Sequence, residues 1–276
     1  MTLSILQTEL LLEEIPTDGH APLKFICNDG NIYYCKYLNS YNRAEINCLA
    51  YEVVAQFLLK QLGIPTPDIA LVKVAPNTLV KSKIQSNRRL REGNICFASR
   101  DVPYVNELQE IQNISKADFN KLINPNDVIK IAAFDLWVNN VDRGRRFPGG
   151  INYNLLIQTI GSKQKIYAFD NAFIFGGVNN IGIFNPKLMV SPYNKFVSSS
   201  FYANVVKQLD VNNFNDVVNN FIPLLGVNYC VQLKEIIDIL GEYWELSPNL
   251  DRRINAYLSN ADHVSNCKNI MLQSKK

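Results

Sequence analysis

One stretch of this chain, residues 129–175, constrains its fold more than any other part of the sequence. It opens with an apolar run that predicts a helix and leads into Asp142. A glycine-containing segment follows, and Asn154 then stands directly before an apolar run that predicts a strand. The next predicted strand ends at Asp170. Two acids and an asparagine therefore lie beside buried-looking elements, in the order acid, asparagine, acid.

This order is the one that phosphoryl-transfer sites use. One carboxylate orients the acceptor hydroxyl, while the asparagine and the other carboxylate hold Mg²⁺ on ATP. On this interpretation Asp142 is the catalytic base, and Asn154 and Asp170 bind the metal. Arg143, next to the base, either neutralises charge at the acceptor or braces the loop. Each residue alone is better explained as a turn residue or a strand cap, and only the combination favours a catalytic site.

A family resemblance rests on three segments of this stretch, DLWVNNVDR at 135–143, NYNLL at 152–156 and FDNAF at 169–173. They resemble the catalytic core of HipA-like kinases. The resemblance implies a bilobal protein-kinase-like fold, the use of ATP and Mg²⁺, and phosphorylation of a hydroxyl-bearing protein substrate on serine or threonine. It also implies the role of a toxin that has an antitoxin-type partner protein.

The sequence departs from these patterns at two places. Tyr153 stands where the HipA-like pattern has proline. Eleven residues separate Asp142 from Asn154, against four in the protein-kinase pattern. Asn152 is therefore an alternative metal ligand, although Asn154 better fits a ligand anchored by the strand that follows it. The additional residues 145–150 either contact an acidic acceptor or form only a longer turn.

The N-terminal region reads as strand, loop, strand and tight hairpin, which is how the small lobe of a kinase begins. Strands are expected over 3–13 and 23–28, and the Asp29-Gly30 pair predicts a hairpin into a third strand over 32–38. The loop between the first two strands carries Gly19 and His20, so we assign these residues to nucleotide binding through backbone N–H groups. A plain hairpin loop is the equal alternative.

The third strand places one cation, Lys36, among apolar residues. An ammonium in a dry site needs an anion, and a kinase supplies one through ATP phosphates and a helix glutamate. The following helix is expected over 44–62, with an apolar face and a glycine C-terminal signal at Gly63. Of its two acids, Glu52 is assigned as the partner of Lys36 in preference to Glu45. An edge lysine and a solvated glutamate are the structural alternatives.

The fold class expected is α+β, a bilobal kinase-like fold with a small β-rich lobe that carries one main helix and a larger, mostly helical lobe. We expect the following division: a small lobe over 1–80, an irregular linker or flap over 81–113, a large lobe over 114–260, and a polar tail over 261–276 that frays.

Composition narrows the classes of partner. A net charge of +3 is too small to indicate nucleic acid or an anionic membrane, and no apolar run approaches the 18 residues typical of a transmembrane helix. The six cysteines form no CxxC pair, which argues against zinc and against a disulfide framework. We therefore expect a cytoplasmic protein that binds neither nucleic acid nor membrane.

Two alternatives to a protein kinase stay open. A kinase of a small molecule or lipid headgroup is one, because phosphoinositide kinases share the Asp-Arg, Asn, Asp arrangement. A non-catalytic nucleotide-binding module is the other, and it is favoured if the long loop cannot place Asp142.

Overall fold

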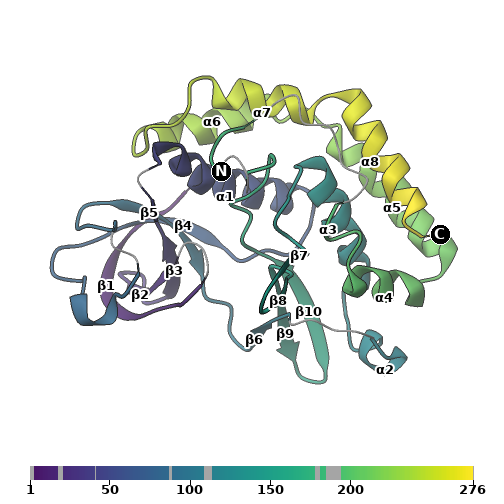
Figure 1. Cartoon of the computed structure of the whole chain (residues 1–276), viewed down its shortest axis with the longest axis horizontal. Helices are drawn as coiled ribbons and strands as arrows, with labels where there is room; N and C mark the ends of the chain where they lie inside the picture. The colour runs from purple at the N-terminus through teal and green to yellow at the C-terminus, as the bar shows by residue number, and fades with distance from the viewer. Residues whose placement is uncertain are drawn as a thin grey trace.

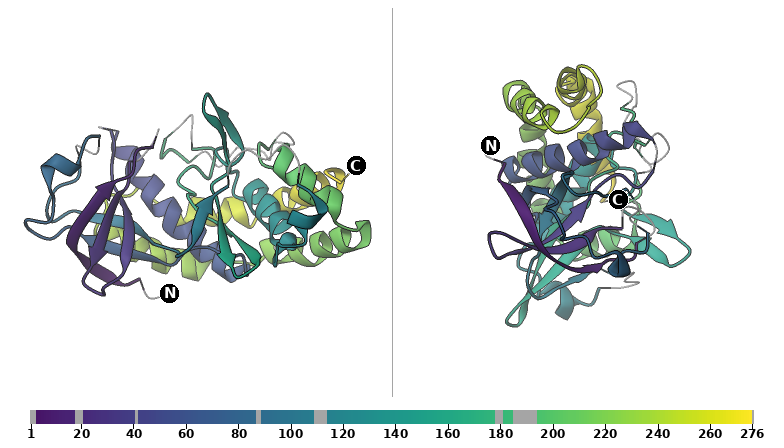
Figure 2. Two further views of the ribbon diagram at one scale, coloured as in Figure 1. Left: turned by 90° about the horizontal axis from the view of Figure 1, so that it is seen from below. Right: turned by 90° about the vertical axis from the view of Figure 1, so that its left-hand side faces the viewer.

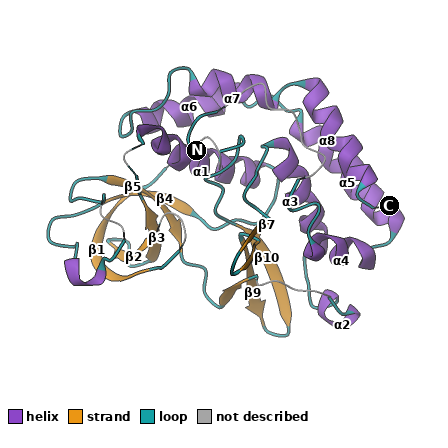
Figure 3. Ribbon diagram, in the orientation of Figure 1, coloured by secondary structure: helices purple, strands orange, loops and turns teal. Residues whose placement is uncertain are grey.

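The chain consists of a β-rich N-terminal part and a helical C-terminal part, which lie side by side along the long axis of the molecule (Figures 1 and 3). This description comes from a computed structural model and covers residues 3–17, 21–40, 42–86, 89–108, 114–177, 181–184 and 194–275. Gly19 and His20, the predicted phosphate-contacting residues, lie outside the described residues.

The N-terminal part is built on a closed five-stranded barrel with the strand order β1-β2-β3-β5-β4. Its strands are β1 (Ile5–Glu14), β2 (Leu23–Cys27), β3 (Ile32–Lys36), β4 (Ile69–Lys73) and β5 (Ile95–Arg100). The expected β2–β3 hairpin is present, and Gly30 takes a positive φ of 75° in its turn. Leu11, Phe25 and Ala98 are among the buried residues that fill the barrel.

Strand β5 corrects the expectation of an irregular linker or flap over 81–113. It pairs antiparallel with both β3 and β4, so it closes the barrel instead of covering a substrate. The barrel therefore continues to Arg100, beyond the expected limit at residue 80. A short 3-10 helix, η2 (Lys81–Lys83), lies in the same stretch.

Helix α1 (Ile46–Gln61) follows a 3-10 turn, η1 (Arg43–Glu45), and ends with Gly63 at a positive φ of 66°. The expected helix is confirmed, but its residues are buried on all sides from Ile46 to Leu59 and not on one face alone. It packs against β5 of the barrel and also against α6 of the helical part. A helix between two layers has no solvent face, and this explains its uniform burial.

A second, three-stranded sheet connects the two parts, with the order β10-β9-β6. Its strands are β6 (Val105–Glu107), β9 (Leu155–Ile160) and β10 (Lys163–Ala168). The additional residues after Asp142 form a separate hairpin of β7 (Arg145–Phe147) and β8 (Gly150–Asn152), which projects from the body in the left view of Figure 2.

The C-terminal part is helical. Its helices are α2 (Lys116–Phe119), α3 (Pro125–Trp137), α4 (Ser200–Gln208), α5 (Val211–Leu225), α6 (Cys230–Gly241), α7 (Leu250–Leu258) and α8 (Ala261–Gln273). Helix α3, which leads into the loop that carries Asp142, packs against α4, α5 and α8. In the described part of the chain, no helix is both long and apolar enough to span a lipid bilayer.

Helix α8 corrects the expectation of a frayed polar tail over 261–276. Its buried residues are His263, Cys267 and Met271, which recur every four positions and so lie on one face. That face packs against α3 and α5, and His263 Nε2 lies 2.6 Å from the carbonyl oxygen of Trp137. The last helix therefore packs against the end of α3, from which the loop that carries Asp142 departs.

Candidate active site

Lys36, on β3, forms two ion pairs at the junction of the barrel and the helical part. Its Nζ lies 2.8 Å from Glu52 Oε1 and 2.8 Å from Asp170 Oδ1, and its side chain is 10 % exposed. Burial disfavours the charge, but the carboxylates of Asp170 and Glu52 outweigh burial and raise the pKa of Lys36 above its ordinary value. Lys36 is therefore a fixed cation at neutral pH.

Glu45, the last residue of η1, and Glu52, on α1, have separate tasks. Glu52 uses its second oxygen, Oε2, to accept the backbone N–H of Asn171 at 2.7 Å, so it ties both Lys36 and the segment after Asp170. Burial raises the pKa of Glu52, and Lys36 opposes that shift. Glu45 instead accepts the N–H groups of residues 39 and 40 and stabilises the connection between β3 and α1. The predicted pairing of Lys36 with Glu52, and not Glu45, is thus present.

The two carboxylate oxygens of Asp142 differ in their hydrogen bonds. Oδ2 accepts Asn152 Nδ2 at 2.9 Å and Asn154 Nδ2 at 3.0 Å. Oδ1 accepts no hydrogen bond from the described residues, although the side chain is largely buried. Burial, and then the negative charge of Asp170, raise the pKa of Asp142 above its ordinary value. The group is a carboxylate with raised basicity and one oxygen available to a hydroxyl.

Asn154 and Asp170 present oxygen donors on the adjacent strand ends. Asn154 uses its side-chain nitrogen to donate to Asp142 and to the carbonyl oxygen of Asp170, so its Oδ1 is available to a cation. Asp170 keeps a side chain that is 32 % exposed. Within the described residues, no group of three or more His, Cys, Asp or Glu could hold a metal by itself. The pair fits Mg²⁺, which takes one or two protein oxygens and completes its shell with phosphates and water.

Arg143 lies inside the protein and is fully buried. Its guanidinium donates to the carbonyl oxygens of Tyr153 at 3.1 Å and of Asn154, and to Asn171 Oδ1 at 2.6 Å. Of the two roles expected for Arg143, this geometry supports bracing, because a buried cation directed at backbone carbonyls cannot reach an acceptor. One side chain thus joins the loop of Asp142 to the segments of both metal-ligand candidates, Asn154 and Asp170.

Asp135, on α3, balances the charge of Arg143. Its Oδ2 lies 2.9 Å from Arg143 Nε in an ion pair without an aligned hydrogen bond, and its Oδ1 accepts Asn140 Nδ2 at 3.1 Å. Burial raises the pKa of Asp135 to about 6, although Arg143 opposes the shift. Asn140 in turn accepts the N–H of Asp142 at 3.1 Å. Asp135 therefore braces the loop through the side chains of Arg143 and Asn140.

The backbone is unusual around these groups. Seven non-glycine residues in the described part have positive φ, and four of them, Asn139, Asn154, Asp170 and Phe175, lie within this one region. Asparagine and aspartate tolerate this conformation better than other side chains, but a phenylalanine at φ 59° is strained. Such strain concentrates at functional sites, where the surrounding structure maintains it.

Comparisons with known proteins agree with this geometry. A family model described as HipA-like kinase matches residues 18–220, well over half of the 276 residues. The chain belongs to the HipA-like kinase family. No curated protein sequence matches this HipA-like kinase.

Solved structures show the same fold in other kinases. A Helicobacter pylori proinflammatory kinase, CtkA, superposes with a TM-score of 0.50 over 99 % of both chains at 12 % identity. A Golgi casein kinase with Mn and ADP bound gives a TM-score of 0.45 at 10 % identity, over 99 % of this chain and 73 % of that one. The superposition on CtkA confirms the bilobal kinase-like fold expected from the sequence. Family and fold together support a phosphotransferase.

One acidic residue of this HipA-like kinase escaped the sequence interpretation. Glu107, at the end of β6, lies close enough to interact electrostatically with Asp170 and Lys36. Burial and the charge of Asp170 raise the pKa of Glu107, and Lys36 opposes the shift. No sequence signal marks it, because its three-residue strand has no pattern and its pairing partner, β9, lies about fifty residues further along the chain.

Proposed function

We propose that this protein is an ATP- and Mg²⁺-dependent kinase that transfers the γ-phosphoryl group to a serine or threonine hydroxyl of a protein. One observation carries the proposal: Lys36, Asp142, Asn154 and Asp170 come from separate segments and meet in one hydrogen-bonded cluster. The cluster contains a cation, a basic carboxylate and two oxygen donors, which are the groups that phosphoryl transfer requires.

Lys36 binds the α- and β-phosphates of ATP in this proposal. Its ammonium stays charged because Glu52 and Asp170 lie within 2.8 Å of it. Glu52 does not contact ATP and acts by holding Lys36 in place. Asn154 and Asp170 hold Mg²⁺, which neutralises charge on the phosphate oxygens.

Asp142 acts on the acceptor. Its Oδ1 accepts a hydrogen bond from the substrate hydroxyl, while its Oδ2 stays fixed by Asn152 and Asn154. As the hydroxyl oxygen bonds to the γ-phosphorus, the bond from that phosphorus to the β–γ bridging oxygen breaks and ADP leaves. The hydroxyl proton passes to Asp142. The raised pKa of Asp142 makes it a stronger base than an ordinary aspartate.

The choice of serine or threonine as acceptor rests on family membership alone. An antitoxin-type partner protein remains a prediction of the same kind, and a cytoplasmic location remains a prediction from the cysteine pattern and the lack of a long apolar run.

The test is an incubation of the pure protein with γ-labelled ATP and a cell lysate, separated afterwards into protein and small-molecule fractions. We expect Mg²⁺-dependent label on serine or threonine of proteins. Label on a small molecule or lipid would show that the acceptor is that molecule and not a protein. The absence of label from both fractions would contradict kinase activity. Asp142→Asn serves as the matched control, because it should remove transfer without removing nucleotide binding.

A further inference from the structure

The β7–β8 hairpin is joined directly to Asp142. Arg145 N donates to the carbonyl oxygen of Asp142 at 2.8 Å, and Gly144 N donates to that of Asn152 at 2.6 Å. Asn152, the last residue of β8, also bonds the Asp142 carboxylate. Both ends of the hairpin are therefore fixed to the residue that receives the acceptor hydroxyl, and the rest of it projects from the body (Figure 2).

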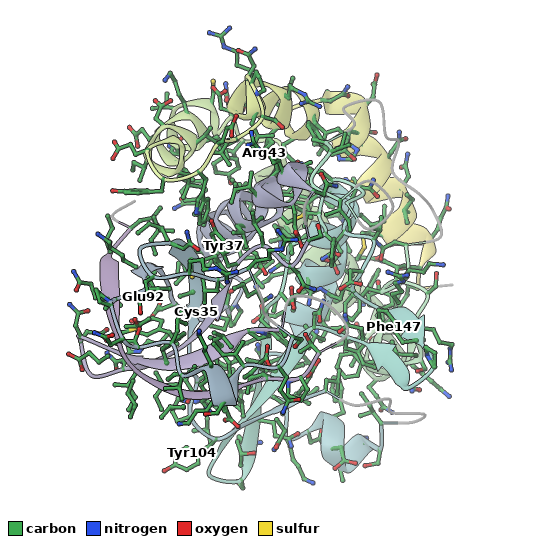
Figure 4. The ribbon with its side chains drawn as sticks, turned by 60° about the vertical axis from the view of Figure 1, so that its left-hand side comes forward. Cys35, Tyr37, Arg43, Glu92, Tyr104 and Phe147 are labelled. Atoms are coloured by element: carbon green, nitrogen blue, oxygen red, sulfur yellow. The ribbon has the colours of Figure 1, made fainter. Side chains whose placement is uncertain are left out.

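Arg145 is held in a defined orientation on this hairpin. Its guanidinium carbon lies 4.9 Å from the centre of the Phe147 ring, and Figure 4 shows Phe147 on the hairpin at the edge of the molecule. A guanidinium stacked on an aromatic ring keeps its N–H edge free to donate. Among the described residues, no carboxylate forms an ion pair with Arg145.

The backbone of a second cationic residue, Lys195, lies against Gly144 at the start of the hairpin. Gly144 has a φ of +79°, and a Cβ there would lie 2.6 Å from the carbonyl carbon of Lys195. The backbone of Lys195 therefore passes directly over the base of the hairpin. Its side chain is exposed, and it forms no ion pair with any residue in the described ranges.

We propose that Arg145 and Lys195 form an acceptor-recognition surface that selects a peptide with acidic residues next to the phosphorylated hydroxyl. This inference rests on the proposed function and names its substrate class. Two cationic residues that form no ion pair in the described part of the chain lie next to the loop of Asp142, and their charges complement carboxylates in the segment that delivers the hydroxyl. Lys36, assigned to ATP, has Glu52 and Asp170 as its ion-pair partners, so the nucleotide already has its own cation.

The experiment measures peptide binding separately from transfer. Two fluorescein-labelled peptides each carry one serine. Glutamates flank the serine in the first peptide, and glutamines flank it in the second. Fluorescence anisotropy is measured with Mg²⁺ and a non-hydrolysable ATP analogue for the parent protein and for the double variant Arg145→Gln/Lys195→Gln. The control double variant, Lys73→Gln/Arg252→Gln, removes the same charge from exposed positions on β4 and α7.

We expect the parent to bind the glutamate peptide about three- to tenfold more tightly than the glutamine peptide, as two partly exposed charge pairs allow. The preference should shrink as salt is raised, because exposed charges are screened. It should disappear in the Arg145/Lys195 variant and persist in the control. Lys195→Glu alone should weaken binding of the glutamate peptide and leave binding of the glutamine peptide unchanged. Because Lys195 is exposed, misfolding would not explain such a selective loss.

Equal binding of the two peptides by the parent would overturn the inference. So would a preference that survives in the double variant, or a loss of affinity for the ATP analogue in place of the peptide. Transfer from γ-labelled ATP to the bound peptide is scored separately. Selective binding without transfer would support the recognition surface and contradict the proposed kinase activity, so the two failures are distinguishable.

Discussion

Replacing Asp142 by asparagine should separate phosphate transfer from nucleotide binding. In the parent, Oδ2 of Asp142 accepts two amide hydrogen bonds, at 2.9 Å and 3.0 Å, and Oδ1 accepts none from the described residues. The oxygen of an asparagine can accept both amide bonds, and its NH₂ group then takes the place of Oδ1. The variant therefore keeps its internal hydrogen bonds and presents a donor where the acceptor hydroxyl needs a base.

The expected loss of turnover follows from the replacement of a base by a hydrogen-bond donor. Loss of a general base commonly reduces turnover by about 10²–10⁴-fold, which corresponds to about 3–5 kcal/mol of barrier. Affinity for Mg·ATP should stay within about twofold of the parent, because Asp142 bonds neither Lys36 nor Glu52. Asp170→Asn should behave differently, because it removes both an ion-pair partner of Lys36 and a candidate metal ligand. That variant should lose metal-dependent ATP binding and turnover together.

The assay pairs calorimetric titration of Mg·ATP with the rate of phosphate transfer, on both variants and the parent. Weak ATP binding by Asp142→Asn together with normal binding by Asp170→Asn would mean that the two carboxylates have exchanged roles. Parental transfer rates in both variants would refute the assignment of this cluster as the catalytic centre.

Three further predictions concern the same cluster. ATP at about 100-fold above its Kd should stabilise the protein by about 2.7 kcal/mol in thermal unfolding, and only with Mg²⁺ or Mn²⁺ present; equal stabilisation in chelator would exclude the metal site. Lys36→Ala should abolish turnover and weaken ATP binding, and Glu52→Gln should have the same effects more mildly. Glu45→Gln should change neither turnover nor ATP binding. A transfer assay in which Glu45→Gln is inactive and Glu52→Gln is active would contradict the tasks assigned to the two glutamates. The kcat/KM for transfer should rise with pH as Asp142 loses its proton, and the midpoint of this rise should lie above the pKa of an ordinary aspartate. The positive charge of Arg145 lowers the pKa of Asp142, so Arg145→Gln should move the midpoint to higher pH. A midpoint that the variant leaves unchanged in pH–rate profiles would contradict this.

Local patterns in the sequence were sufficient for much of the fold. The Asp29-Gly30 turn, the α1 helix and its glycine end, and α3 all depend on neighbours within a few residues, and they are present as expected. Strand β5 could not be recognised because both of its partners, β3 and β4, are distant in sequence. Helix α8 was missed because its buried positions hold His263 and Cys267, which are weak apolar signals in a polar segment.

In the candidate site, too, local features were predictable from the sequence and features that depend on distant segments were not. The pairing of Lys36 with Glu52 was predictable, because one cation on an apolar strand required an acid on the next helix. The sequence left two roles open for Arg143, because it does not indicate that the side chains of Arg143 and Asp135 both point inward and pair. The position of Glu107 beside Asp170 likewise depends on the pairing of β6 with β9.

The bonds of Lys36 and Glu52 have a consequence for lobe motion. Lys36 belongs to the barrel and Glu52 to its helix, while Asp170 and Asn171 belong to the opposite lobe, so two short bonds clamp the lobes together. Any ligand that draws Lys36 away from Asp170 must loosen that clamp, and any force that separates the lobes must free Lys36. By thermodynamic reciprocity, the two events change each other's equilibrium by the same factor. A partner protein that wedges the lobes apart would therefore alter nucleotide affinity without touching the nucleotide.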